Sequence, residues 1–142
     1  MIYMAIQPSV EPELDRQRSA TIGRYFAAMQ AGDYPALETI LTPGSVTRWP
    51  QSGETITGAT GCVRVYQNYP GGPPSYRLER ISGDGVVWVA ELVADYGPER
   101  WHILSVFEFE DTRIARVTDY FGPAVPAPEW RRELVDHEPA VG

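Results

Sequence analysis

None of the 142 residues is lysine, so all twelve basic side chains are arginines. Without lysine the chain cannot form a Schiff base, anchor pyridoxal phosphate or build a phosphate-binding loop that ends in Gly-Lys-Ser or Gly-Lys-Thr. A single cysteine, Cys62, excludes a disulfide framework and any multi-thiolate zinc or iron–sulfur site. Two histidines, His102 and His137, cannot supply a three-histidine metal centre. Carboxylates, tyrosines, arginines and tryptophans remain for chemistry.

A basic surface and long hydrophobic runs are also missing from the sequence. Its 19 acidic and 12 basic residues give a net charge of −7, which argues against binding to nucleic acid or to an anionic membrane surface. No run approaches the ~20 apolar residues that a membrane span needs. Residues 1–10 have neither the positive region nor the apolar stretch of a signal peptide. We therefore expect a cytoplasmic protein.

The apolar periodicity predicts helices in the first part of the chain and strands in the second. The expected helices begin at Pro12, at Asp33 and at residue 59, and the expected strands are Val46–Trp49, Thr55–Thr57, Tyr76–Ile81, Val86–Tyr96, Trp101–Glu110 and Arg113–Phe121. The last four strands are joined by connections too short for parallel crossovers, so we expect antiparallel pairs. The chain reads as a single α+β domain over residues 1–142, with a core at about 12–122 and a proline-rich tail at 123–142 that carries a short helix, Glu129–Val135.

Two carboxylates interrupt apolar stripes in the predicted strands. Glu91 alternates with Val87, Val89 and Val93, and Asp119 alternates with Ala115, Val117 and Phe121. A carboxyl group on an apolar wall has a raised pKa and suits general acid/base work near neutral pH. The alternative is that each is a structural ion pair, for which Arg24 or Arg48 could be the partner. The sequence leaves open whether the two acids share one pocket.

Aromatic residues supply the remaining candidates for a small-molecule site. Tyr25, on the inner face of the first helix, could donate a hydrogen bond to a substrate oxygen or could be a core residue. Trp49 and Trp101 could wall a pocket for an apolar ligand, and ordinary core packing is the alternative. Trp88 lies on the opposite strand face from Glu91, which makes it a candidate for a subunit interface. His102 should point away from the face that carries Trp101.

Two stretches give the sequence a family resemblance. Residues 25–33 read Tyr-Phe-Ala-Ala-Met-Gln-Ala-Gly-Asp, and residues 113–121 read Arg-Ile-Ala-Arg-Val-Thr-Asp-Tyr-Phe. With the order of elements, they resemble the nuclear-transport-factor-two-like superfamily, and in particular its SnoaL-like branch of polyketide cyclases and limonene epoxide hydrolase. The resemblance implies a cone-shaped, curved antiparallel sheet with three N-terminal helices on its concave face, and often a homodimer formed through the outer sheet face.

The resemblance also implies catalytic positions. Limonene epoxide hydrolase activates water with an Asp-Arg-Asp set helped by a Tyr and an Asn, and the last Asp of that set matches Asp119. The Arg and the first Asp fall at Glu91 and Val93, and the Tyr and Asn fall near Thr47 and Trp49, so that machinery is incomplete here. SnoaL-like cyclases use an acid/base residue on the last strands, a role that Asp119 could fill.

The resulting prediction is a cofactor-independent acid/base enzyme that acts on a hydrophobic, oxygenated small molecule by isomerase- or cyclase-type proton transfer. The predicted catalytic residues are Asp119, Glu91 and Tyr25, and the predicted substrate-binding residues are Trp49, Trp101, Phe121, Arg48 and Tyr66. No metal is expected. The alternatives are an epoxide-hydrolase-like enzyme with altered residues and a non-catalytic module for ligand binding or dimerisation.

Overall fold

The computed structural model describes residues 11–139, and the helices and strands in this range follow the predicted order. The helices are α1 (Pro12–Ala31), α2 (Tyr34–Ile40) and α3 (Gly58–Gln67). The strands are β1 (Leu41–Trp49), β2 (Glu54–Thr57), β3 (Ser75–Asp84), β4 (Val87–Asp95), β5 (Arg100–Glu110) and β6 (Arg113–Pro123). Residues 1–10, which the signal-peptide prediction concerns, lie outside the described residues.

The sequence marks the ends of the first two helices. Pro12 occupies the first position of α1, where its missing N–H costs no hydrogen bond. Gly32 ends α1 in the left-handed conformation, with φ of 68°, and its N–H donates to the carbonyl of Met29. Asp33 then caps α2, because its side chain accepts a hydrogen bond from the N–H of Ala36. These predicted boundaries are confirmed.

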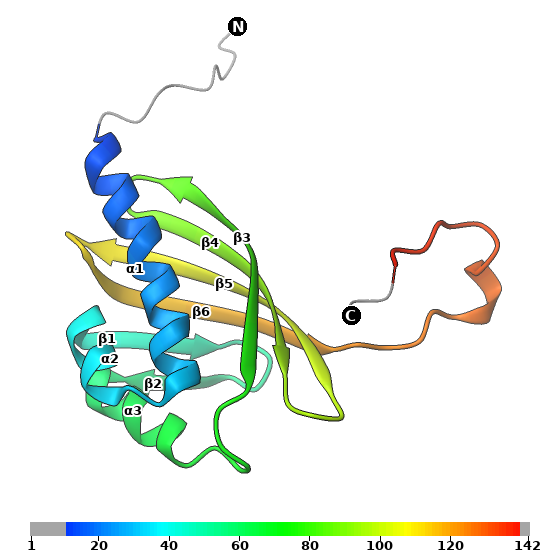
Figure 1. Cartoon of the computed structure of the whole chain (residues 1–142), viewed down its shortest axis with the longest axis horizontal. Coiled ribbons are helices and arrows are strands. Elements are labelled where there is room, and N and C mark those ends of the chain that lie inside the picture. Colours follow the sequence, from blue (N-terminus) through cyan, green and yellow to red (C-terminus); the bar gives the residue numbers. More distant parts are fainter. Residues whose placement is uncertain (1–10, 140–142) are drawn as a thin grey trace, which may run out of the picture.

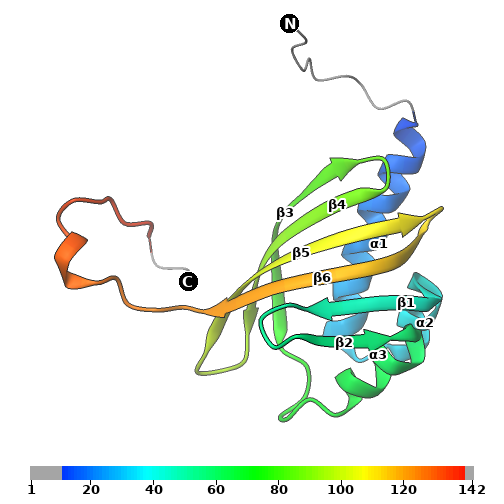
Figure 2. The same cartoon turned by 180° about the vertical axis from the view of Figure 1, so that it is seen from behind.

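The sheet is mixed rather than purely antiparallel. Its six strands, within residues 11–139, lie in the order β2-β1-β6-β5-β4-β3 (Figure 2). The predicted antiparallel pairing from β3 to β6 is confirmed, but β1 pairs with β6 in parallel. The antiparallel prediction rested on short connections between consecutive strands. It did not apply to β1 and β6, because half of the fold lies between them in the sequence. The parallel pair brings Trp49 of β1 beside the end of β6.

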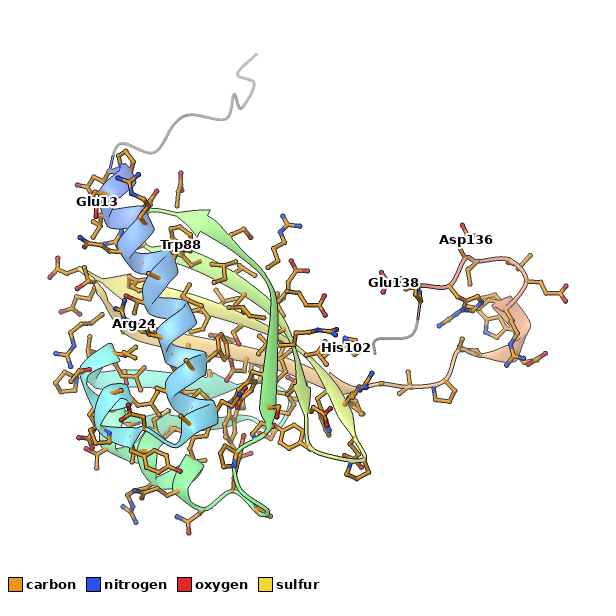
Figure 3. The ribbon with its side chains drawn as sticks, in the orientation of Figure 1. Glu13, Arg24, Trp88, His102, Asp136 and Glu138 are labelled. Atoms are coloured by element: carbon orange, nitrogen blue, oxygen red, sulfur yellow. The ribbon has the colours of Figure 1, made fainter. Side chains whose placement is uncertain are left out.

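The sheet curves around α1, which crosses its concave face (Figure 1). Tyr25 and Phe26 of α1 pack edge-on against Phe107 of β5, with ring centroids 5.4 and 5.9 Å apart. The core also contains Trp88, which is only 6% exposed and lies beside α1 (Figure 3). The prediction that Trp88 belongs to a subunit interface is therefore wrong, because its strand face is the concave one.

A buried arginine connects the first half of α1 to two hairpin turns of the sheet. Arg18 is only 5% exposed, and its guanidinium donates to the carbonyls of Gly85 and Asp111 at 2.6 and 2.8 Å. Gly85 lies in the β3–β4 turn and Asp111 in the β5–β6 turn. Asp15 accepts a hydrogen bond from the N–H of Gly85. One side chain thus holds two hairpin turns against the helix.

The tail leaves the body of the domain after β6 (Figure 1). The predicted helix Glu129–Val135 is reduced to a three-residue 3-10 turn, Glu129–Arg131. Trp130 and Leu134 are 74% and 77% exposed, so no apolar partner in residues 11–139 stabilises a longer helix. Asp136 and Glu138 also lie on this projecting segment (Figure 3).

Candidate functional site

A cavity of about 390 Å³ lies between the concave face of the sheet and helices α1 and α3. This volume is within the range of about 300–1,000 Å³ that is usual for small-molecule sites. Nine of its fifteen lining residues are aromatic, and none is arginine or histidine. The lining residues are Tyr25, Phe26, Met29, Trp49, Tyr66, Tyr69, Pro70, Tyr76, Tyr96, Glu99, Trp101, Ile103, Ser105, Asp119 and Phe121.

The exposure of the lining residues distinguishes a floor from a mouth. Tyr25, Tyr66 and Ser105 are between 1% and 4% exposed and form part of the floor. Tyr96 is 39% exposed, and Glu99 on the β4–β5 loop is also exposed, so these residues mark the mouth. A ligand would therefore bury one end against α1 and the central strands and leave its other end near the β4–β5 loop.

Asp119 is the carboxyl group on the floor side of the cavity. It lies on the inner face of β6 between Val117 and Phe121, opposite Ser105 of β5. One carboxylate oxygen, Oδ1, accepts a hydrogen bond from Ser105 Oγ at 2.6 Å, and the other, Oδ2, accepts one from Trp49 Nε1 at 3.0 Å. Both donors are neutral, and no salt bridge to Asp119 occurs within residues 11–139.

The surroundings of Asp119 favour its protonated form. Burial raises the pKa of this carboxyl group, and the hydrogen bonds from Ser105 and Trp49 offset part of the rise by stabilising the carboxylate. A carboxyl group with a raised pKa can both release and accept a proton near neutral pH. Asp119 thus has the properties of a general acid or base.

The hydroxyl group of Tyr25 is a second polar group on the floor. It is buried and makes no hydrogen bond of standard geometry among residues 11–139, although the hydroxyl of Tyr66 lies near enough to lower its pKa slightly. An unpaired buried hydroxyl costs free energy, which a ligand oxygen could recover by accepting its hydrogen bond. Burial raises the pKa of both Tyr25 and Tyr66 well above the usual range of tyrosine, so both hydroxyls stay protonated at neutral pH.

Six of the eight predicted site residues line this cavity: Asp119, Tyr25, Trp49, Trp101, Phe121 and Tyr66. Trp49 and Trp101 each contact Phe121, with ring centroids 6.2 and 5.9 Å apart. Strand alternation therefore located the inner faces of β5 and β6 correctly.

Glu91 and Arg48 do not line the cavity. Glu91 lies on the outer face of β4, with its side chain 51% exposed and 3.5 Å from the guanidinium of Arg80. The apolar residues that alternate with Glu91 lie on the same, convex face of the sheet. Val93, for example, is paired with the outward-facing His102 of β5. Ala90, Leu92 and Ala94 are the inward-facing residues of β4, so this strand adds no acid or base to the cavity. We therefore leave Glu91 out of the proposed site.

Several lining residues were not singled out from the sequence. Tyr76 is the second residue of β3 and Tyr69 follows α3, while Tyr96 and Glu99 lie on the β4–β5 loop. Tyr96 had a usable signal, because it is the last residue of the predicted strand Val86–Tyr96 and alternates there with apolar residues. The signal for Tyr76 was weaker, because a register shift after Leu78 interrupts the alternation of its strand. Tyr69 and Glu99 lie in loops, whose path the apolar periodicity does not describe. His102, by contrast, points outward as predicted and is exposed (Figure 3).

The hydrogen bond from Trp49 yields a prediction for the pKa of Asp119. Replacing Trp49 by Phe removes a donor that stabilises the carboxylate, so the pKa of Asp119 should rise further above its ordinary value. Titration of the side-chain carboxyl carbon by ¹³C NMR measures this pKa. The matched control is Trp130→Phe, on the exposed tail, which should leave it unchanged. If the pKa of Asp119 falls or stays the same in Trp49→Phe, the hydrogen bond from Trp49 does not stabilise the Asp119 carboxylate.

The described residues offer no metal site and no membrane span. No group of three or more His, Cys, Asp or Glu side chains within residues 11–139 is placed to hold a metal ion. No helix in this part of the chain is both long and apolar enough to cross a membrane.

The sequence matches the family model of the SnoaL-like domain over residues 22–117, and the chain therefore belongs to the SnoaL-like family. The predicted resemblance is confirmed by this match. No protein among those with curated functions matches the sequence.

Solved structures share the fold over most of the chain. An NTF2-like protein of unknown function from Burkholderia xenovorans is 27% identical, with a TM-score of 0.78, and the match covers 92% of this chain and 100% of that one. A provisionally assigned ketosteroid isomerase from Kribbella flavida is 28% identical, with a TM-score of 0.79 and coverage of 89% and 93%. An LEH-like epoxide hydrolase from M. tuberculosis is 23% identical, with a TM-score of 0.65 and coverage of 76% and 84%. The predicted α+β fold is thus confirmed.

Proposed function

We propose that this protein is a cofactor-independent acid/base enzyme that moves a proton on a hydrophobic, oxygenated small molecule, as isomerases and cyclases do. The observation that carries the proposal is the carboxyl group of Asp119, which lies in an aromatic cavity with only neutral hydrogen-bond donors beside it. Membership of the SnoaL-like family and the likeness to a provisionally assigned ketosteroid isomerase support the same class of chemistry.

The proposed reaction divides the work between two residues. The carboxylate of Asp119 removes a proton from a carbon next to the carbonyl group of the substrate, and the electron pair of that C–H bond moves toward the carbonyl oxygen. The unpaired hydroxyl of Tyr25 donates a hydrogen bond to the oxygen as negative charge develops there. Asp119 then returns the proton to another carbon, which completes an isomerisation. Alternatively, the carbanion attacks the carbon of a second carbonyl group, and Asp119 gives its proton to the resulting alkoxide, which completes a ring closure.

Epoxide hydrolysis by the limonene epoxide hydrolase mechanism has less support. That mechanism needs an arginine and a second aspartate beside Asp119, and the positions that the resemblance gives them, Glu91 and Val93, are on the outer face. The cavity lining contains no arginine. The likeness to the LEH-like enzyme concerns the fold, so we rank proton transfer first.

The test uses a small, flat and uncharged carbon acid as a probe, 5-nitrobenzisoxazole. A base removes the proton on C3 of this compound, the electron pair forms a nitrile, the N–O bond breaks and the oxygen leaves as a coloured phenolate. We expect the native protein to open the ring with kcat/KM rising with pH as the Asp119 carboxyl ionises.

A ring-opening rate equal to that of the buffer alone would contradict the proposal. In that case saturable binding of the probe, seen as a change in tryptophan fluorescence, would favour a non-catalytic ligand-binding module. The tryptophans Trp49 and Trp101 line the cavity and would report such binding. The same experiment thus separates an enzyme from a binding protein.

We also propose that the protein is a homodimer that pairs through the outer sheet face, as the family resemblance implies. Val87, Leu104 and Tyr120 are 47%, 39% and 45% exposed on the sheet and would supply apolar contacts. Sedimentation equilibrium should give the mass of two chains for the native protein. Leu104→Glu should give the mass of one chain, because it would bury an unpaired charge in the contact. A native protein that is monomeric at micromolar concentration contradicts this proposal.

A further inference from the structure

The mouth of the cavity combines aromatic rings with a carboxylate. Tyr69, Tyr96 and Trp101 follow one another around it, with centroids 6.5 Å apart for the first pair and 6.4 Å for the second. The ring planes meet at 57° and 73°, so the rings form adjoining walls rather than a stack. Rings arranged in this way can turn their negative faces toward one bound cation.

Glu99 is held at the same place by two hydrogen bonds. Its carboxylate Oε2 accepts one from Trp101 Nε1 at 3.2 Å, and its backbone carbonyl accepts one from the N–H of Tyr96 at 2.9 Å. The carboxylate is therefore held at the edge of the Trp101 ring, in the turn that also carries Tyr96. Three aromatic walls and one carboxylate are the components with which proteins recognise alkylated ammonium groups.

The fixed charges of the cavity agree with a cationic ligand group. Its two carboxyl residues, Glu99 at the mouth and Asp119 toward the floor, have no basic counterpart among the lining residues. The neighbouring Arg100 faces Asp95 across the β4–β5 pairing and is not part of the lining. The net charge of −7 also attracts cations to the molecule. Anionic groups such as carboxylates or phosphates would be repelled by Glu99 at the mouth and would find no basic side chain among the lining residues.

We propose that the substrate carries an alkylated ammonium group, which Tyr69, Tyr96, Trp101 and Glu99 bind at the mouth while the oxygenated end of the substrate reaches Asp119. This inference rests on the proposed function for the inner end of the ligand and adds the chemical class of the outer end. The reacting end of the substrate is uncharged and its anchoring end is cationic. Asp119 therefore transfers the proton, and Glu99 binds the positive charge.

The experiment compares two probes of nearly the same shape, 4-(trimethylammonio)phenol and 4-tert-butylphenol. They differ in one atom, a positively charged nitrogen in place of carbon. Dissociation constants are measured by NMR titration, with the indole N–H signal of Trp101 as reporter. In an ordinary apolar pocket the tert-butyl compound binds more tightly, because the cation must lose water. Here the ammonium compound should bind about 5- to 10-fold more tightly to the native protein.

Variants identify the groups that produce the preference. Glu99→Gln removes the charge but keeps the shape and should abolish the preference for the ammonium compound. Tyr96→Leu removes one ring and should reduce the preference several-fold. The matched control is Glu110→Gln, which makes the same change in net charge at the opposite end of β5 and should keep the native preference.

Tighter binding of 4-tert-butylphenol by the native protein would overturn the inference, and so would an equal loss of preference in Glu99→Gln and Glu110→Gln. These outcomes are distinguishable from failure of the proposed function, which is judged by ring opening of 5-nitrobenzisoxazole. If ring opening occurs but the ammonium preference is absent, only the inference fails. If the preference depends on Glu99 but no ring opening occurs, the mouth binds ammonium groups and the acid/base proposal fails.

Discussion

Replacing Asp119 by Asn should lower kcat/KM for the ring opening of 5-nitrobenzisoxazole by about 10²- to 10⁴-fold, which is the usual contribution of a general base. An amide has nearly the shape of a carboxyl group but cannot accept a proton from carbon at neutral pH. The Asn oxygen can accept the hydrogen bond from Trp49, and its NH₂ group can donate to the hydroxyl of Ser105, so the local packing is kept. The loss of activity would therefore reflect the chemistry.

The stability of the same variant provides the control for folding. Because burial raises the pKa of Asp119 in the folded state, its contribution to stability is full below the unfolded pKa, about 4, and declines as the pH rises through the folded pKa. At pH 7 Asp119→Asn should thus be at least as stable as the native protein, and the difference should shrink at acidic pH. A large fall in the melting temperature at pH 7 would indicate a structural acid instead.

Glu91→Gln is the matched comparison for this activity. Both carboxylates interrupt apolar stripes in the sequence, but Glu91 is half-exposed on the outer face and paired with Arg80. Its replacement should leave kcat/KM unchanged within error. A strong loss of activity in Glu91→Gln would mean that the outer face takes part in the reaction and would contradict the site as we describe it.

Arg18→Ala should lower the free energy of unfolding by about 2–4 kcal/mol, because it removes the hydrogen bonds that a buried guanidinium donates to two turn carbonyls, one of which, that of Gly85, keeps Trp88 Nε1 as a second donor. The two carbonyls belong to Gly85 and Asp111, in different hairpin turns. The guanidinium also lies over the ring of Phe109, 5.7 Å from its centroid, so packing is lost as well. Urea denaturation measures the change, which should appear as a lower midpoint.

Two further variants separate the causes of this loss. Arg18→Met keeps an unbranched apolar side chain at this position but removes the guanidinium and its hydrogen bonds, so this variant should lose most of the same stability. Arg16→Ala removes an exposed arginine in the same helix, paired only with Glu13, and should change stability by less than about 0.5 kcal/mol. Equal effects of Arg18→Ala and Arg16→Ala would contradict the role of Arg18.

The sequence was informative where a pattern has one structural meaning. Gly32 and Asp33 mark a helix end and a helix cap, and both were predicted from residue type alone. The inner face of β6 was also predictable, since Asp119 shares it with Val117 and Phe121. Strand alternation does not say which of two faces is concave, however. Glu91 was misplaced for this reason, because both faces of β4 are apolar.

Long-range relations account for the other differences. The parallel pairing of β1 with β6 brings Trp49 to Asp119, 70 positions later, and no local pattern encodes that hydrogen bond. The mouth of the cavity depends on how two loops meet, which places Tyr69 beside Tyr96. The burial of Arg18 was equally hidden, because an arginine on a helix usually faces solvent and its acceptors here are backbone carbonyls.

The central claim is that the Asp119 carboxyl group itself accepts the proton, and one measurement tests it most directly. The pKa of Asp119, obtained by ¹³C NMR titration of the native protein, is compared with the pKa that governs kcat/KM for ring opening. We predict that the two values coincide and lie above the ordinary value of an aspartate, as burial of the carboxyl group requires. An Asp119 that titrates at its ordinary value, or a rate that follows a different pKa, would contradict the account.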